Sequence, residues 1–222
     1  MKGSRFLNPF KLLYSIVPTF SSFQSNPKLE ILKTFVLYTG IGYINSFMSI
    51  NVINPLKSAP PLPDVLFGVL PNIPDWVPHS MLFCLTLLTL YKLRKSGRVL
   101  IQMYNRISLL FVLRVLCFTF TPLPPPVPGC VARLQGEAFH WNVVRDLIQS
   151  RGLTCSDMMF SGHAIHFIAF MWVLWPGSTF WRKVALLTYV SLGLISIIAS
   201  HLHYTADVLV GIFLTVLMFR MN

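Results

Sequence analysis

The sequence predicts an all-α protein that crosses a membrane through six helices. Of its 222 residues, 54% are hydrophobic and only 11% are charged, whereas a soluble domain carries about a quarter charged residues. Apolar windows recur along the chain at close to the length of a membrane span, which is about 20 residues. Basic residues gather in the short segments between these windows. Together these observations indicate that much of the surface faces lipid.

The apolar windows place the six spans in order along the chain. They cover residues 29–53, 77–91, 99–121, 161–175, 184–200 and 205–219. The second and fourth are short and need flanking residues to cross a bilayer. Prolines crowd the loops 54–76 and 122–160, and proline stops a helix because it removes a backbone donor and fixes φ. We expect one membrane domain, 29–222, after a cytosolic or interfacial N-terminal segment, 1–28.

The distribution of charge predicts the orientation. The net charge of +11 would suggest nucleic acid in a soluble protein, but no basic stripe with interleaved exposed aromatics is present. With six spans, the following basic residues share one side: Lys2, Arg5, Lys11, Lys28, Lys33, Lys92, Arg94, Lys95, Arg98, Arg182, Lys183 and Arg220. Positive charge in short loops marks the cytosolic face. We therefore expect cytosolic termini, long loops that are lumenal or exoplasmic, and a location in the Golgi, another endomembrane or the plasma membrane.

The cysteines fit that orientation. Cys84 and Cys117 fall in predicted spans, where they serve as small apolar residues. Cys130 and Cys155 share the long exoplasmic loop, and an oxidising compartment would permit a disulfide there. The sequence leaves open whether the two form one. It also leaves open whether the chain forms a homo-oligomer.

Two segments carry the candidate chemistry. Residues 155–163 read CSDMMFSGH and place His163 at the exoplasmic end of the fourth span. Residues 199–207 read ASHLHYTAD and place His203 and Asp207 at the same end of the sixth. Ionisable side chains inside a membrane protein are costly and indicate function. The alternative is that both histidines are satisfied by backbone groups and that Asp207 caps a helix.

These residue types suit covalent phosphotransfer. His203 and Asp207 are four residues apart and would share a helix face. A carboxylate on one imidazole nitrogen fixes the tautomer and leaves the other nitrogen free to attack phosphorus. His163 could then protonate the leaving group and later deprotonate the acceptor. A long proline-rich loop over the site would limit hydrolysis by excluding water.

The two segments, CSDMMFSGH and HYTAD, together resemble the lipid phosphatase/phosphotransferase superfamily. The more specific resemblance is to its sphingomyelin synthase and inositol-phosphorylceramide synthase branch. It also includes PLPD at 61–64, the stretch from Tyr104 to Arg106, and PLPPPVPG at 122–129, and it spans residues 55 to about 219. The phosphatase branch would have a proline before SGH and an arginine six residues before the second histidine. Here Phe160 and Ile197 stand at those positions, which favours transfer of a diester over hydrolysis of a monoester.

The resemblance implies a function and a set of site residues. It implies a six-helix enzyme that moves phosphocholine, phosphoethanolamine or phosphoinositol from a glycerophospholipid to ceramide and releases diacylglycerol. Its catalytic triad would be His163, His203 and Asp207, and it would need neither metal nor other cofactor. Alternatives are a lipid phosphatase, a phospholipase C-like hydrolase, or a lipid-binding membrane protein without catalysis. Ala164 departs from the family, where a small hydroxyl residue commonly follows SGH.

Other residues are weaker candidates. Within the motifs we expect the following to bind substrate: Arg106, Asp157, Ser161, Gly162 and Tyr204. Arg106 lies inside a span and could instead form a structural ion pair, and Asp157 could instead cap a loop. His166 lies one helical turn beyond His163 and could face the same cavity, but we favour packing in the core. We expect His201 to lie at the interface without a role. His79 and His140 carry no functional argument from the sequence.

Overall fold

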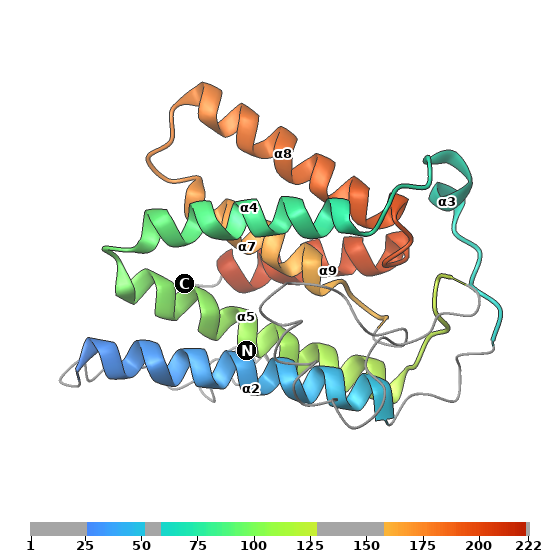
Figure 1. Ribbon diagram of the computed structural model, residues 1–222, viewed down its shortest axis with the longest axis horizontal. Helices are drawn as coiled ribbons and strands as arrows, with labels where there is room; N and C mark the ends of the chain where they lie inside the picture. The colour runs from blue at the N-terminus through green and yellow to red at the C-terminus, as the bar shows by residue number, and fades with distance from the viewer. Residues whose placement is uncertain (1–25, 52–58, 128–157, 221–222) are drawn as a thin grey trace, which may run out of the picture.

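The computed structural model describes residues 26–51, 59–127 and 158–220, and every regular element within them is a helix. Predictions for the N-terminal segment, Asp157, His140 and the pair Cys130 and Cys155 fall outside these residues. Six long helices and one short helix make up the described fold (Figure 1). They are α2 (Pro27–Asn51), α3 (Val65–Val69), α4 (Trp76–Leu93), α5 (Gly97–Phe120), α7 (Gly162–Leu174), α8 (Phe180–Ala199) and α9 (Thr205–Arg220).

The all-α prediction is confirmed for the described residues, and each predicted span coincides with one long helix. Successive long helices run in alternating directions, so the N-termini of α4, α7 and α9 lie toward the pole at which α2, α5 and α8 end (Figure 1). Among the helices described, α5 and α8 are long and apolar enough to cross a membrane, and α7 is a shorter apolar helix. The predicted crossing of a bilayer by all six helices stays a prediction.

Helices α2 and α5 run side by side in the same direction (Figure 1). Ile31 packs against Gly97, where an added Cβ would lie 3.3 Å from Ile31 Cδ1. About two helical turns further along both helices, the rings of Tyr38 and Tyr104 meet edge to face with centroids 4.9 Å apart. This parallel packing places Asn45 of α2 level with Arg114, in the C-terminal half of α5.

Helix α7 forms the centre of the bundle and touches α4, α5, α8 and α9. Its buried apolar residues, among them Ile165, Phe167 and Phe170, are almost completely inaccessible. Gly211 lets α9 approach closely, because a Cβ there would lie 3.1 Å from the Ser161 carbonyl oxygen and 3.2 Å from Ala164 Cβ. The N-terminal turn of α7 and the first turns of α9 are therefore held against each other.

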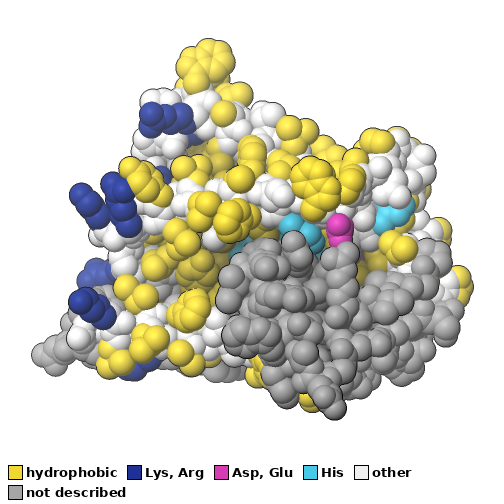
Figure 2. All heavy atoms as spheres, in the orientation of Figure 1, with side chains coloured by type: hydrophobic (Ala, Val, Ile, Leu, Met, Phe, Trp, Pro, Cys, Tyr) yellow, Lys and Arg dark blue, Asp and Glu magenta, His cyan; other side chains and the backbone are white. Residues whose placement is uncertain are grey.

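The outer faces of the bundle are apolar, and charge lies at its poles. Large exposed hydrophobic side chains cover α2, α8 and α9, including Phe35, Trp181 and Phe213, as expected of helices that face lipid. Figure 2 shows Lys and Arg gathered at one pole and His with an acidic side chain toward the other. At the basic pole, Lys92 Nζ donates hydrogen bonds to the backbone oxygens of Val173, Leu174 and Pro176. This charge separation is the one that the span assignment predicts.

Candidate active site

The candidate site lies where the N-terminus of α7 meets the turn from α8 into α9. The Ser161 backbone N–H donates to the Asp207 carbonyl oxygen at 3.0 Å, which ties the two segments together directly. The Ser161 hydroxyl accepts from the Ala164 N–H at 3.3 Å and caps α7. The structure thus brings the SGH and HYTAD segments, some 40 residues apart in the sequence, to one place at the same pole.

Asp207 is held rigidly. Its carboxylate is buried in the first turn of α9, where the helix dipole favours negative charge. Oδ1 accepts from the Met159 N–H at 3.1 Å, and Oδ2 accepts from the Tyr204 N–H at 3.2 Å. The carboxylate position is therefore set by backbone groups from both segments before any substrate arrives.

His203 faces this carboxylate. Its Nδ1 lies 3.6 Å from Asp207 Oδ2, close enough for an ion pair but longer than a hydrogen bond. Within the described residues, this buried nitrogen has no hydrogen-bond partner, so a small rotation of the ring toward Oδ2 would satisfy it. Catalytic hydrogen bonds are commonly long before substrate binds. Since Nδ1 points at Asp207, Nε2 is the nitrogen available for chemistry.

His163 lies beside His203. The two rings are 6.1 Å apart between centroids and inclined by 61°. On its other side, His163 Nε2 forms a 3.0 Å hydrogen bond with Nδ1 of His79, a residue of α4 that is 7% exposed. His163, His203 and Asp207 are thus adjacent, and a histidine from α4 completes the row.

The other predicted site residues fall into two groups. Ser161, Gly162 and Tyr204 lie within the site through the contacts of their segments. Arg106 lies elsewhere, with its guanidinium carbon 5.3 Å from the Phe219 ring centroid near the opposite end of α9. This placement sets Arg106 apart from His163 and His203, because α5 carries it toward the basic pole, and its role in substrate binding stays a prediction.

Arg114, two turns further along α5, reaches the site instead. Its Nε donates to the Phe160 carbonyl oxygen at 2.7 Å, and its Nη1 donates to Asn45 Oδ1 of α2 at 2.8 Å. A Cβ added to Gly162 would lie 3.8 Å from the guanidinium carbon. Arg114 therefore fixes the backbone just before His163 and places a buried positive charge next to the site.

Sequence reasoning missed the positions of His79 and Arg114. The topology contains a signal for His79, because this residue lies near the start of its span, at the same pole as His163 at the start of α7. For Arg114 the signal is its position in the sequence. Arg114 lies closer than Arg106 to the proline-rich segment that follows α5. The expectation that His166 packs in the core agrees with the structure, because its ring lies among Tyr38, Phe111 and Phe170.

His166 also links α2 to the SGH segment. Its Nδ1 bonds to the Gly162 carbonyl oxygen at 2.7 Å, which requires Nδ1 to carry the hydrogen. In the neutral ring, Nε2 then accepts from the Tyr38 hydroxyl at 2.8 Å. This chain of hydrogen bonds fixes the tautomer of His166 and occupies both of its nitrogens, so it supports the site rather than reacting in it.

Two proline-rich loops attach to the site through the turn before α9. The Tyr204 hydroxyl accepts from the Leu62 N–H at 3.0 Å and donates to the Pro124 carbonyl oxygen at 3.1 Å. Asp64 accepts from the Thr205 N–H at 2.6 Å and from the Thr205 hydroxyl at 2.8 Å. The PLPD segment thus caps the N-terminus of α9 and holds Tyr204 and Thr205 in place.

The Asp64 contact predicts sensitivity to acid. Burial alone would raise the pKa of Asp64, but the hydrogen bonds from Thr205 and Leu66 outweigh it and lower the pKa below its ordinary value. A carboxylate with a lowered folded-state pKa stabilises the fold above its unfolded-state pKa, and this contribution is lost as the pH falls through the lowered value. We expect the melting temperature in detergent to fall on acidification below about pH 4, with a smaller fall in Asp64→Asn. An equal fall in both proteins would contradict this role.

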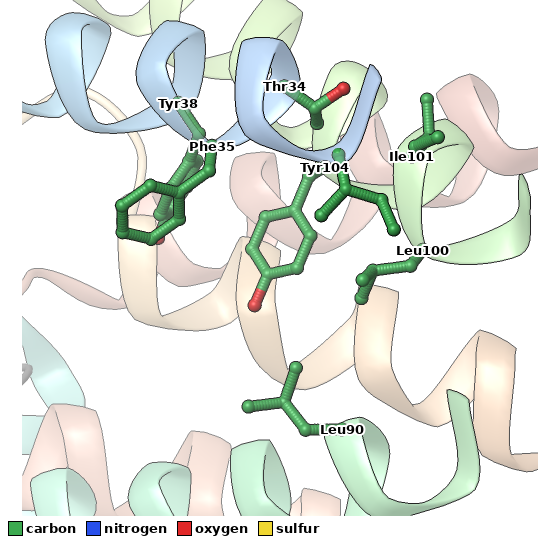
Figure 3. A pocket seen from close by; sticks show the side chains of 8 residues that line it. Thr34, Phe35, Tyr38, Leu90, Leu100, Ile101 and Tyr104 are labelled. Carbon is green, nitrogen blue, oxygen red and sulfur yellow. The ribbon is translucent and has the colours of Figure 1, made fainter. Parts of the chain in front are cut away.

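Two cavities lie away from His163 and His203, and the first is lined by Tyr38, the partner of His166. One, of about 180 Å³, is enclosed almost entirely by apolar groups of α2, α4 and α5, and Tyr38 and Tyr104 line it (Figure 3). The other, of about 820 Å³, lies between α4 and α8 and ends near Lys92 and Arg182 at the basic pole. Neither includes His163, His203 or Asp207. In the described part of the chain, no group of three His, Cys, Asp or Glu side chains could hold a metal ion.

Comparison with known proteins gives two findings. Residues 154–222 match the family model described as PAP2 superfamily C-terminal, a stretch that contains the three predicted catalytic residues. The chain is 27% identical to human sphingomyelin synthase-related protein 1 over 85% of its own length and 50% of that protein's. The predicted resemblance to the sphingomyelin synthase branch is confirmed.

Relatives named as transferases support the same branch. The chain is 25% identical to Gallus gallus phosphatidylcholine:ceramide cholinephosphotransferase 1 over 86% of its length and 52% of the relative's. It is 30% identical to Trypanosoma brucei brucei phosphatidylethanolamine:ceramide ethanolaminephosphotransferase over 54% of its length and 38% of the relative's. The chain therefore spans about half or less of the length of these curated relatives. By their names, the latter two relatives are phosphotransferases that act between a phosphatidyl lipid and ceramide.

Proposed function

We propose that this protein is a sphingolipid synthase that transfers a phosphoryl head group from a glycerophospholipid to ceramide. The observation that carries the proposal is the alignment of His163, His203 and Asp207 at one pole, with the His203 ring directed at a fixed, buried carboxylate. The relatives' names supply the class of donor and acceptor. The six long helices would span the membrane, with the basic pole cytosolic and the site lumenal or exoplasmic.

In the first half-reaction, His203 Nε2 attacks the phosphorus of the donor phosphodiester. The bond from phosphorus to the diacylglycerol oxygen breaks, and His163 supplies the proton that this oxygen needs to leave as an alcohol. The product is a phosphohistidine that carries the head group. Asp207 stabilises the positive charge that develops on His203, as in other histidine–carboxylate pairs.

In the second half-reaction, the primary hydroxyl of ceramide takes the place of diacylglycerol. His163, now neutral, accepts the hydroxyl proton as the oxygen attacks phosphorus, and the bond from phosphorus to His203 Nε2 breaks. Enzyme protonation is thereby restored, and no cofactor is consumed. The spacing of the two imidazole rings, 6.1 Å between centroids, suits groups that act on opposite sides of one tetrahedral phosphate.

Dependence on the acceptor tests the proposal. Purified protein in mixed micelles would be given fluorescent ceramide and, in separate reactions, phosphatidylcholine, phosphatidylethanolamine or phosphatidylinositol, with products identified by mass. We expect one donor to give a ceramide phosphodiester and diacylglycerol in equal amounts, with at least tenfold less diacylglycerol when ceramide is omitted. Equal release of diacylglycerol without ceramide would instead identify a hydrolase. No turnover with any donor would contradict catalysis.

A further inference from the structure

The inference concerns His79, which the sequence analysis did not place in the site. It lies one turn into α4, is largely buried, and meets His163 across a separation of 84 residues in the sequence. The ring centroids are 4.8 Å apart and the planes are tilted by 46°. The 3.0 Å contact between His79 Nδ1 and His163 Nε2 has the length of a hydrogen bond.

This contact constrains the protons of both rings. A single hydrogen lies between the two nitrogens, because two hydrogens would clash there and none would leave two lone pairs opposed. If His163 is to be protonated on both nitrogens, as a general acid must be, its Nε2–H has to donate to a lone pair on His79 Nδ1. His79 is then neutral, with its own hydrogen on Nε2. His163 Nδ1 remains the nitrogen that can exchange a proton with substrate.

We propose that His79 is the positioning residue of His163: it accepts the Nε2–H of the protonated ring and aims His163 Nδ1 at the reacting oxygens. This inference rests on the proposed function, in which His163 is the acid and base. It assigns a different partner to each reacting histidine. His203 has a carboxylate, which suits a nucleophile that must gain positive charge, and His163 has a neutral imidazole.

A neutral partner fits the task of His163. A carboxylate would hold the proton of His163 strongly and make its transfer to the diacylglycerol oxygen harder. A neutral acceptor orients the ring without that cost, so His163 can release the proton and take it back in one turnover. Among the described residues, the charged and titratable groups around His163 are His79 of α4, Arg114 of α5, His166 of α7, and His203 with Asp207 behind it.

Three substitutions at His79 separate positioning from a purely structural role. His79→Ala removes the acceptor, and we expect kcat to fall about 10–100-fold with KM changed less than about threefold. His79→Gln keeps a neutral acceptor and should recover part of that loss. His79→Glu supplies a carboxylate, so protonated His163 should persist to higher pH. In the His79→Glu variant, the pH at which kcat falls on the alkaline side should rise by about one unit or more.

The matched control is His201→Asn. His201 lies in the turn before His203, stacks on Phe67 and has φ of 52°, a conformation that asparagine tolerates. Its kcat and pH profile should equal those of the unsubstituted protein. Melting temperature and size-exclusion profile are recorded for every variant, so a loss of folding is separated from a loss of rate.

The outcomes distinguish this inference from the function on which it depends. If transfer requires His203 but the His79→Glu profile superimposes on that of the parent, or His79→Ala keeps full kcat, the positioning role is wrong and the function stands. Full activity of His203→Ala would overturn the proposed function itself. The assay uses fluorescent ceramide with the donor that the parent protein accepts.

Discussion

Substitution of His203 by alanine is expected to abolish head-group transfer, with kcat reduced about 10³-fold or more. The proposed reaction passes through a bond between phosphorus and His203 Nε2, and removing a covalent nucleophile leaves only positioning and polarisation by the remaining groups. The ring fills a buried place between Asp207 and His163, so some loss of stability is also expected. The measurement is the initial rate of fluorescent product formation in mixed micelles.

A trapping experiment separates loss of the nucleophile from loss of structure. The parent protein, incubated with a phospholipid whose phosphate is radiolabelled and with no ceramide, should acquire an acid-labile label and release unlabelled diacylglycerol. His203→Ala should acquire none, whereas His201→Asn in the same turn should label like the parent. If His203→Ala is monodisperse and still becomes labelled, another residue is the nucleophile.

Substitution of Asp207 by asparagine is expected to reduce kcat about 10²–10⁴-fold with little change in shape. The carboxylate accepts hydrogen bonds on both oxygens, from Met159 and Tyr204. An amide presents only one oxygen, so its NH₂ group must face one of these backbone donors or the Nδ1 of His203. It also removes the negative charge that stabilises an imidazolium at His203. The rates of both half-reactions should fall, because each passes through that charge.

Two further variants support the interpretation of Asp207→Asn. Asp207→Ala should lose more stability than Asp207→Asn, because it leaves two buried N–H groups without an acceptor, at about 1–3 kcal/mol each. Asp207→Glu keeps the charge but displaces it, and it should recover some labelling in the trapping experiment. Asp207→Asn with more than a tenth of the parent kcat would show that the carboxylate acts mainly through structure.

Much of the fold follows from the sequence, because its helices are set by local properties. Apolar windows of the right length predicted six helices, and each coincides with a long helix in the structure. Proline clusters correctly separated α2 from α4 and α5 from α7. The short α3 was not predicted, since five residues (Val65–Val69) inside a proline-rich loop give no periodic signal. Its start depends on Asp64, which accepts from the Leu66 N–H.

The site was predictable only in part, because contacts between helices depend on how each helix is rotated. Spacing and topology brought His163, His203 and Asp207 to one pole, but they could not tell which face of α5 points inward. Arg106 and Arg114 both lie in that helix, and eight residues turn the chain through slightly more than two turns. Packing against Asn45 of α2 and the Phe160 carbonyl selects Arg114 for the site. His79 was missed because the sequence does not show which face of α4 turns toward His163.

The double attachment at the Tyr204 hydroxyl has a consequence for attempts to redesign head-group choice. A graft of residues 59–64 or 122–127 from a relative would replace the partners of a phenol that sits one position from the proposed nucleophile. A chimera that misplaced the Leu62 amide or the Pro124 oxygen would shift His203 itself, so its new preference would be obscured by a slower enzyme. Useful exchanges therefore keep these two backbone groups in place and vary the side chains around them.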